Sequence, residues 1–397
     1  MYSPTRLRTE VRFDLFAQTW RWCSFLVVAL ALGSFALSPL ARAVTPAPDG
    51  GYPGSNTAEG DDALLSLTSG VQNTAIGFQA LRDNTTGEVN TAIGNVALAG
   101  NTTGSANTAT GSDALTLNTT GSGNTANGWG ALNSNSTGSR NTAVGTLALV
   151  GSNGDSNTGI GDSALRNNTT GTQNTATGVD ALASNTTGNN NTATGVDALA
   201  NNTADNNTAS GTNALSLNTT GSSNTANGYG ALSSNTTGSF NTAIGSVALA
   251  NNTGDNNTAS GSNALQGNTT GSANTANGDG ALESNTTGSS NTAIGAAALD
   301  SMTIGNSNTA NGQSALRFAT TGNQNTATGD SALISMTTGS SNIALGNSAG
   351  ANLTTGNNNI DIGNAGVAGE SRTIRIGTQG TQTKTFVAGV FGTGVSG

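Results

Sequence analysis

The sequence has 397 residues, with 57 glycines, 8% charged residues, 4% aromatic residues and no histidine. Its formal net charge of -9 argues against nucleic acid or an anionic membrane surface as a partner, because those polyanions bind proteins through clusters of Lys and Arg. Low charge and few aromatics would also suit a disordered chain, but Ala and Leu recur in a fixed register, which indicates a folded repeat.

The start of the chain has the features of an export signal. Several arginines precede an apolar run over 25–37, and residues 41–43 (A-R-A) supply a small-x-small cleavage pattern. The run is shorter than the roughly 20 residues of a spanning helix, which favours a cleaved signal over the alternative of an uncleaved membrane anchor. The single cysteine, Cys23, lies in this segment, so the exported chain would have no disulfide. We predict a signal peptide at 1–43 and a secreted or cell-surface protein.

A stretch rich in Pro and Gly follows at 44–55, and we predict a linker there because Pro lacks the donor that a regular ladder needs. Behind it, a pentad with the pattern N-T-A-x-G or a variant of it recurs nineteen times at a spacing of 16 or 17 residues, usually followed three residues later by A-L. The pentads begin at Asn56, Asn73, Asn90, Asn107, Asn124, Asn141, Asn157, Asn174, Asn191, Asn207, Asn224, Asn241, Asn257, Asn274, Asn291, Asn308, Asn325, Asn342 and Asn359. Such self-similarity predicts a stack of small supersecondary units over 56–370, each touching mainly its neighbours.

One repeat, residues 90–106 with the sequence N-T-A-I-G-N-V-A-L-A-G-N-T-T-G-S-A, represents a single coil. It predicts a first strand at 90–93, a bend at Gly94, a second strand at 96–99 and a turn at 101–104. A helix is disfavoured because Thr, Asn and Gly recur within every turn's length. The chain is therefore predicted to be all-β, a parallel β-roll (solenoid) of about 19 short coils with two strands per coil.

Small side chains are predicted to fill the coils. The third pentad residue is Ala in 17 of 19 pentads and the A-L pair is also present in 17, which suits a narrow coil that Ala and Leu fill without overpacking. We expect the leucines of these pairs to form one interior ladder: Leu81, Leu98, Leu115, Leu132, Leu149, Leu165, Leu182, Leu199, Leu215 and Leu232. The first pentad residue predicts either a ladder of stacked amides or turns in which Asn bonds its own backbone: Asn73, Asn90, Asn107, Asn124 and Asn141. Neither role is catalytic, and no cofactor or metal is expected.

The sequence leaves open which of pentad positions two and four faces inward, since position two is nearly always Thr and position four is mixed. The mixed fourth position suits a partly exposed or inter-subunit face. Because so thin an interior buries little apolar surface against the backbone entropy of each coil, we expect the chain to self-associate. The apolar fourth residues should then be buried between chains: Ile76, Ile93, Val144, Ile244 and Ile294.

A slower rhythm of 50 residues groups the coils in threes. The last coil of each group is one residue shorter and carries an acid just before the next pentad: Asp155, Asp205 and Asp255. With parallel strands roughly 4.8 Å apart, these acids would recur about every 14 Å. A calcium ladder is disfavoured because each acid stands alone, whereas calcium needs several converging oxygens. Duplication of a three-coil block is the preferred explanation.

These residues resemble those of a known family. N-T-A-I-G followed by x-x-A-L is similar to the S-V-A-I-G-x-x-A head repeats of trimeric autotransporter adhesins, the YadA-like heads, most closely at 73–77, 241–245 and 374–377. The resemblance implies a left-handed β-roll and a homotrimer whose ligand lies on extracellular matrix, on a cell surface or on an abiotic surface. The C-terminal β segment at 371–397 resembles the one ahead of phage tail-spike-type chaperone domains. The second-position Thr and the N-T-T-G turn depart from the family pattern.

We favour a non-enzymatic adhesin-type head or rod that presents a repetitive polar surface. An ice- or crystal-surface-binding solenoid is one alternative, because Thr recurs at the second pentad position, although Thr-x-Thr pairs occur in only four pentads. A structural spacer of a fibre protein is another. An enzyme of the parallel β-helix type is disfavoured, because the seven basic residues after residue 43 form no cluster that could serve catalysis.

Overall fold

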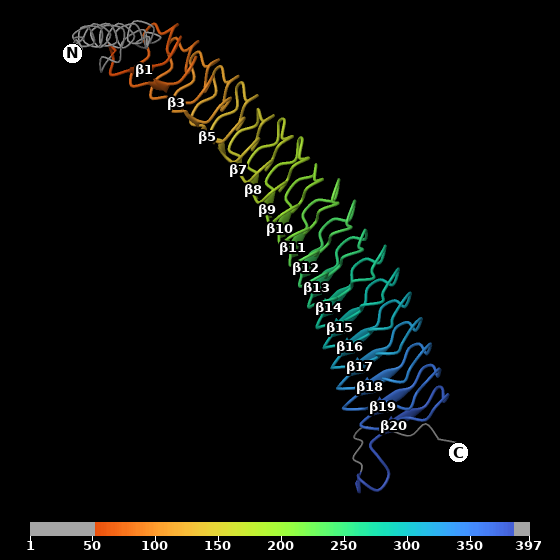
Figure 1. The fold of residues 1–397 in the computed structure, drawn as a ribbon. Coiled ribbons are helices and arrows are strands. Elements are labelled where there is room, and N and C mark those ends of the chain that lie inside the picture. Colours follow the sequence, from red (N-terminus) through yellow and green to blue (C-terminus); the bar gives the residue numbers. More distant parts are fainter. Residues whose placement is uncertain (1–51, 385–397) are drawn as a thin grey trace, which may run out of the picture. The chain divides into compact units, whose positions relative to one another are not determined.

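The computed structural model describes residues 52–384, so the predicted signal peptide and the residues from 385 onward lie outside the described part. Between 52 and 384 the chain forms twenty strands of three residues and no helix (Figure 1). The strands are β1 (Thr57–Glu59), β2 (Thr74–Ile76), β3 (Thr91–Ile93), β4 (Thr108–Thr110), β5 (Thr125–Asn127), β6 (Thr142–Val144), β7 (Thr158–Ile160), β8 (Thr175–Thr177), β9 (Thr192–Thr194), β10 (Thr208–Ser210), β11 (Thr225–Asn227), β12 (Thr242–Ile244), β13 (Thr258–Ser260), β14 (Thr275–Asn277), β15 (Thr292–Ile294), β16 (Thr309–Asn311), β17 (Thr326–Thr328), β18 (Ile343–Leu345), β19 (Ile360–Ile362) and β20 (Ile374–Ile376). No helix among these residues is long and apolar enough to cross a membrane.

Each strand from β2 to β19 pairs in parallel with the strand one coil before it and with the strand one coil after it, and β1 and β20 pair with β2 and β19. Equivalent pentad residues are always opposite each other, as in Ala92 with Ala109. The shorter coils keep this register, since Thr142 of β6 pairs with Thr158 of β7. The prediction of an all-β parallel solenoid of about 19 coils is therefore confirmed. The last strand, β20, comes from the tail and continues the same stack.

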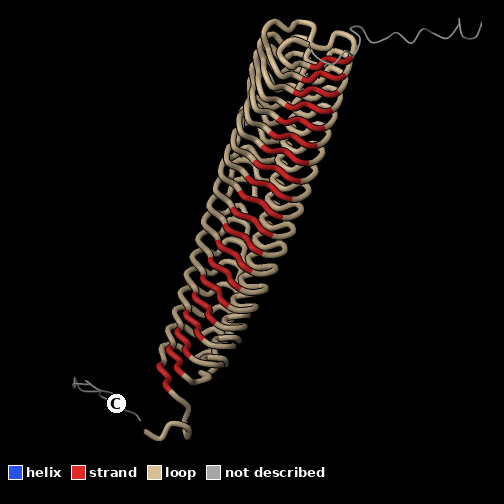
Figure 2. The backbone as a smooth tube through the Cα atoms, turned by 90° about the vertical axis from the view of Figure 1, so that its left-hand side faces the viewer, coloured by secondary structure: helices blue, strands red, loops and turns tan. Residues whose placement is uncertain are grey.

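The prediction of two strands per coil is wrong, because only the pentad side of each coil is a strand. Figure 2 shows the strands in one row, with turns and loops making up the rest of every coil. Residues 96–99 form consecutive turns in which Val96 and Leu98 have φ of 50° and 53°. These values lie in the left-handed region and are incompatible with an extended chain. The turns still join the stack, since the Leu98 N–H donates to the Ala114 carbonyl over 2.9 Å.

Residues 52–55, expected as the end of a linker, belong to the first coil. The Tyr52 N–H donates to the Asn56 carbonyl over 3.0 Å, and the Gly54 carbonyl accepts from the Gln72 N–H over 2.8 Å. Pro53 lies between these two bonded groups, where no N–H donor is used. This short segment therefore turns across the start of the stack.

A continuous column of Ala and Leu fills the interior along the stack. The third pentad residue and both residues of the A-L pair are fully buried in nearly every coil, as in Ala92, Ala97 and Leu98. All ten leucines predicted for the interior ladder are completely buried. The interior is one side chain thick, so coil closure depends on more than apolar contact.

The fifth pentad residue must be glycine for two reasons. Gly145 has φ of 132°, which L residues rarely adopt, and a Cβ built on it would lie 2.5 Å from the carbonyl oxygen of Gly161 in the next coil. The same close approach of backbone to backbone recurs along this column. Glycine therefore sets both the bend after the strand and the spacing between coils.

Candidate functional site

Alternation along each strand decides which pentad residues are available to a ligand. In β3, Ala92 is buried, Thr91 is half-buried and Ile93 is exposed, and Asn90 before the strand is buried. Pentad positions one and three therefore face inward, and positions two and four both face outward. We call the side on which these two positions lie the outer face. The sequence left open which of pentad positions two and four faces inward, and the structure shows that neither does.

The outer face carries a single row of threonines. Every second pentad residue from Thr57 in β1 to Thr326 in β17 is Thr, and each pairs in register with the next, for example Thr208 with Thr225. Beyond β17 the row changes to Ile343, Ile360 and Ile374. The row therefore offers seventeen identical hydroxyl groups at the strand spacing of roughly 4.8 Å.

The fourth-position column beside this row is mixed. Five of its apolar members, which we expected to be buried between chains, are 37–47% exposed in the single chain: Ile76, Ile93, Val144, Ile244 and Ile294. Asn127, Asn227 and Asn277 occupy the same column. The column is therefore apolar only in part, and the burial of its apolar members between chains stays a prediction.

The first pentad asparagines form a buried amide ladder, as one of the two interpretations predicted. The Asn90 Oδ1 accepts from the backbone N–H of Asn107 over 3.0 Å and from its Nδ2 over 3.1 Å. The Asn90 Nδ2 donates to the carbonyl of Gly104, on the far side of its own coil, over 2.9 Å. We call this column the strand ladder. It includes Asn73, Asn107, Asn124 and Asn141, and it joins coils along the stack and closes each coil across the interior.

A second buried amide ladder runs through the N-T-T-G turns, and the sequence interpretation missed it. The Asn101 Nδ2 donates to the Asn84 Oδ1 over 2.7 Å and to the Gly104 carbonyl over 2.9 Å. This turn ladder consists of Asn84, Asn101, Asn118, Asn135, Asn168, Asn185, Asn202, Asn218, Asn235, Asn252, Asn268 and Asn285, all fully buried. Ser152 takes the position between Asn135 and Asn168, and its Oγ accepts from the Asn168 Nδ2 over 3.1 Å. The signal was present as a second Asn at constant spacing, but Asn in a turn is usually exposed.

Near both ends of the stack the turn ladder gives way to apolar residues. Met302, Ala319, Met336 and Leu353 occupy its position in successive C-terminal coils, and all four are fully buried. Asn285, the last amide, has no partner for its Oδ1. Sections with amides and sections with apolar side chains therefore fill the same interior position, and Asn285 marks the boundary.

The acids of the shorter coils are part of a third ladder, on the surface. The Oδ1 of Asp155 accepts from the Ser139 N–H over 2.8 Å, and the Oδ1 of Asp255 accepts from the Ser239 N–H over the same distance. In longer coils a serine hydroxyl has this role, as when Ser122 accepts from the Ser105 N–H over 3.1 Å. Within residues 52–384 no group of three or more Asp, Glu, His or Cys could hold a metal ion. The acids are thus accounted for by backbone capping.

The C-terminal coils contain the one buried carboxyl among the described residues. Asp361 takes the place of the inward Ala in β19, is 1% exposed, and has no hydrogen-bond partner for either carboxylate oxygen. Burial, and then the nearby Glu370, raise the pKa of Asp361. Glu370 pairs with Arg375 over 2.7 Å, and this hydrogen bond lowers the pKa of Glu370. Gly350 and Gly366 stand where other coils have interior side chains, which leaves room for the carboxyl.

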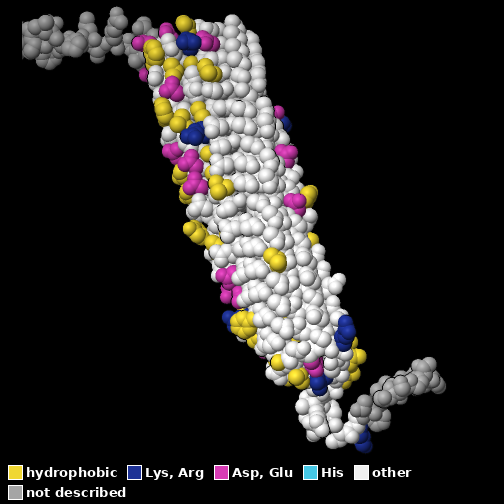
Figure 3. All heavy atoms as spheres, turned by 90° about the vertical axis from the view of Figure 1, so that its right-hand side faces the viewer, with side chains coloured by type: hydrophobic (Ala, Val, Ile, Leu, Met, Phe, Trp, Pro, Cys, Tyr) yellow, Lys and Arg dark blue, Asp and Glu magenta, His cyan; other side chains and the backbone are white. Residues whose placement is uncertain are grey.

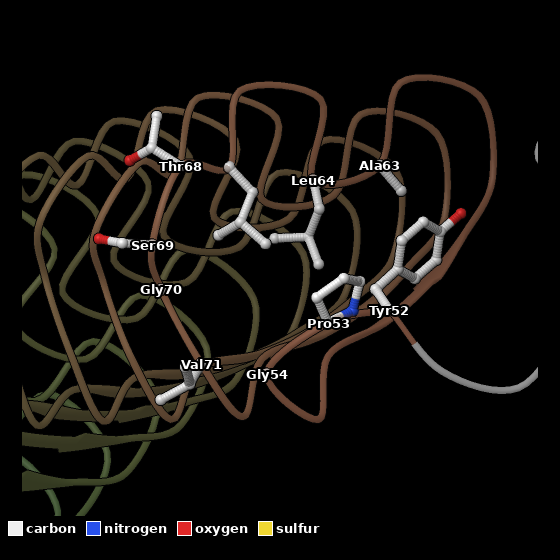
Figure 4. A pocket seen from close by; sticks show the side chains of 10 residues that line it. Tyr52, Pro53, Gly54, Ala63, Leu64, Thr68, Ser69, Gly70 and Val71 are labelled. Carbon is white, nitrogen blue, oxygen red and sulfur yellow. The ribbon is translucent and has the colours of Figure 1, made fainter.

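The start of the stack has a cavity of about 400 Å³ where the interior of the first coil is open. Its walls are mainly apolar, and Figure 4 shows Leu64 pointing toward Pro53 of the segment that crosses the opening. Leu67 and Val71 complete the apolar part of the lining. With no ionisable side chain among its lining residues except Tyr52, the cavity has no group suited to acid or base chemistry.

No protein-family model matches the chain, and no curated protein is similar to it in sequence. The parallel β-solenoid of about 19 coils rests on the structure, and the likeness of the pentads to the heads of trimeric adhesins is a likeness of repeat pattern.

Proposed function

We propose that this chain is an exported, non-enzymatic rod of the adhesin type, which presents a repetitive polar surface outside the cell. The observation that supports it best is the unbroken row of seventeen outward threonines on one face. Figure 3 shows another side of the stack as mostly uncharged polar side chains and backbone, with acidic and apolar side chains toward its edges. Many weak contacts to a repeating ligand, each worth little, add up when they are held at fixed spacing.

The proposed partner is a surface with repeated polar groups, on extracellular matrix, on another cell or on an abiotic material. We further propose that the chain acts as a homotrimer, with the apolar members of the fourth-position column between chains. The interior is only one side chain thick, so burial of additional apolar area between copies would stabilise the stack. The mass in solution of residues 44–397, measured by sedimentation, tests this part, and a stably folded monomer would refute it.

Attachment of cells tests the adhesive role. We expect deletion of the gene to reduce attachment to at least one of a matrix-coated, a cell-coated and a bare surface, and the wild-type chain to restore it. A variant with Thr175, Thr192, Thr208 and Thr225 each changed to Glu should fail to restore attachment, because it removes four neighbouring hydroxyls from the outer face. A matched variant changes four exposed turn threonines, Thr120, Thr170, Thr220 and Thr270, to Glu and should restore it. Unchanged attachment on every surface after deletion would refute the role.

The threonine row also supports a second candidate, an ice- or crystal-binding solenoid. Hydroxyls in register on a parallel sheet could match a crystal lattice, although a second outward Thr stands beside the row only at Thr110, Thr177, Thr194 and Thr328. Thermal hysteresis of the purified protein tests it. A freezing point equal to the melting point would remove this candidate and leave the adhesive one standing.

A further inference from the structure

The outer face changes character in the last three strands. In β18, β19 and β20 both outward positions are apolar, and they are paired in register as two rows of three: Ile343, Ile360 and Ile374, and Leu345, Ile362 and Ile376. Leu345 is 49% exposed and Ile376 is 71% exposed, whereas Ile360 and Ile362 between them are half-buried. We call these six residues the terminal apolar face. A contiguous patch of this kind marks a surface that something covers.

At the same end of the stack, β20 is the edge strand among the residues that the structure describes. In earlier coils the second pentad N–H donates to the first residue of the next pentad, as when the Ile360 N–H donates to the Thr373 carbonyl over 2.9 Å. Among residues 52–384, β20 pairs with β19 alone, and no described carbonyl accepts from the N–H of Ile374. A free edge next to exposed Ile side chains promotes pairing with another strand.

The sequence beyond residue 384 supplies a strand of matching pattern. The glycines that end the last pentads are Gly346, Gly363 and Gly377, and the next glycine in this series is Gly392, so the spacings are 17, 14 and 15 residues. Before Gly392 stand Gly389, Val390 and Phe391, which would take the second, third and fourth pentad positions. Twelve residues separate Ile376 from Gly389, compared with eleven between Ile362 and Ile374. The connection is therefore long enough for one more coil of the size that precedes it.

We propose that residues 389–391 dock on the free edge of β20 as a further parallel strand, with Phe391 extending the row of Leu345, Ile362 and Ile376. The occupant is a segment of the same chain, and its chemistry fits the site because residues 385–397 carry no charge and include two Phe and three Val. Val390 would cover the inward residue of β20, Arg375, whose guanidinium is already paired with Glu370. The inference depends on repeat spacing and on the open edge, and it is independent of the adhesive role.

Disulfide trapping in the full chain tests the pairing. In a Cys23→Ser background, Ile376→Cys with Phe391→Cys places two thiols at equivalent positions of neighbouring strands, where Cα atoms about 4.8 Å apart allow a bridge. The control pair is Ile376→Cys with Val395→Cys, four residues farther along the same segment. We expect the first pair to form a bridge within one chain at least tenfold faster than the control. Equal rates would overturn the proposal, and bridges between chains would show that a second copy occupies the edge instead.

Hydrogen exchange gives a second readout that needs no new bond. In this register the Val390 N–H donates to the Ile374 carbonyl, so Val390→Pro removes the bond, whereas Val395→Pro lies outside the pairing. We expect the amides of Ile374 and Ile376 to exchange at least tenfold faster in Val390→Pro than in the wild type, with no change in Val395→Pro. Exchange at the rate of an unstructured peptide in the wild type would overturn the proposal.

Discussion

The side-chain amides of Asn90 and Asn101 donate to one acceptor, the carbonyl oxygen of Gly104, over 2.9 Å each. Asn90 stands at the start of the strand and Asn101 in the turn that closes the same coil, so the pair fastens the two sides of the coil across its interior. The next coil repeats the arrangement with different residues. Stacked amide networks of this kind stabilise a coil too narrow for a large apolar core. In the turn ladder, only the Oδ1 atoms of Asn135, Asn185 and Asn285 have no hydrogen-bond partner.

Loss of one amide from the middle of the turn ladder should destabilise the chain. Asn118 donates to Asn101 and to Gly121, and it accepts from Asn135. Asn118→Met leaves the buried Asn101 Oδ1 and one Asn135 N–H without partners, at a cost of about 1–3 kcal/mol in the free energy of unfolding. Urea unfolding followed by circular dichroism measures it.

The boundary of the turn ladder supplies the control. Asn285 already lacks a partner for its Oδ1, and the next coil has Met302 at the same position. Asn285→Met should therefore destabilise the chain less than Asn118→Met does. Equal losses at the two sites would contradict the assignment of stability to the amide network.

Substitution of Ala for glycine should have very different effects on stability at two positions, Gly145 and Gly123. Gly145→Ala forces a Cβ against the Gly161 carbonyl at φ of 132°, so we expect a loss of at least about 3 kcal/mol from strain and local unstacking. At Gly123, φ is 70° and the nearest group to a new Cβ is the Arg140 Cγ at 3.7 Å. Ala106 already occupies the equivalent position with φ of 57°. Gly123→Ala should therefore be neutral or slightly stabilising. Thermal unfolding of both variants checks this, and similar losses would disprove the column's role.

The stability of the last coils should depend on pH through Asp361. Because its pKa in the folded chain is raised, its contribution is fully present below the ordinary carboxyl pKa of 3.8 and is lost as pH rises through the raised value. Most coils have Ala at this position. Asp361→Ala should therefore remove the loss of stability that accompanies ionisation, and it should stabilise the C-terminal coils at pH 7 by about 1–3 kcal/mol. Hydrogen exchange of residues 343–376 between pH 4 and pH 8 measures it.

Glu370 should show the opposite dependence. Its pKa is lowered by Arg375, so its contribution is present at neutral pH and is lost as pH falls through the lowered value. Glu370→Gln should weaken the same coils at pH 7 and leave stability at strongly acid pH unchanged. If both variants changed stability in the same direction at pH 7, the assignment of the two carboxyls would be wrong.

Calcium should have no effect on the acids of the shorter coils. Asp205 accepts from the backbone N–H of Asn189 over 2.7 Å, a bond that Asn can also accept. Asp205→Asn should be nearly neutral, and Asp205→Ala should lose about 0.5–1.5 kcal/mol. Addition of millimolar calcium should leave the unfolding temperature of the wild type unchanged. A rise with calcium that Asp205→Asn abolishes would restore the metal interpretation.

Substitutions in the fourth-position column should weaken self-association, and substitutions of exposed apolar residues outside the strands should not. Ile244→Asn with Ile294→Asn introduces a residue that other coils have at the same position, such as Asn227, so the single chain should still fold. The proposed trimer should dissociate at least tenfold more readily in sedimentation. As a control, Leu117→Asn with Leu217→Asn changes two equally exposed apolar side chains outside the strands and should leave the mass unchanged. A monomer in the control variant, or an unchanged trimer in the first, would contradict the proposed interface.

Repetition made the interior predictable from sequence. Ala and Leu at fixed pentad spacing identified a buried column, and Leu98 and its equivalents lie there. The polar interior was half predicted: Asn90 belongs to a ladder, but Asn101 reads as an ordinary turn residue. Asn101 differs from an ordinary turn residue because its side chain donates to the carbonyl of Gly104, and only the closed coil brings these two groups within reach.

The second side of the coil was not predictable from residue types. Leu98 and Val96 are typical strand residues, yet both have left-handed backbone conformations. Tertiary stacking imposes them, because each turn must present its N–H groups to the next coil while it turns the chain through a very short path. Gly54 is a similar case, since its carbonyl accepts from the Gln72 N–H of the next coil, a contact that only the stack supplies.

Because β6 and β7 stay aligned across a 16-residue coil, a 50-residue block can be removed or inserted without disturbing either junction. Unequal crossing-over within the gene would then lengthen or shorten the protein in steps of three coils, roughly 14 Å each. The distance between the two ends of the stack would then change in whole blocks, while the strands on either side of each junction keep their register.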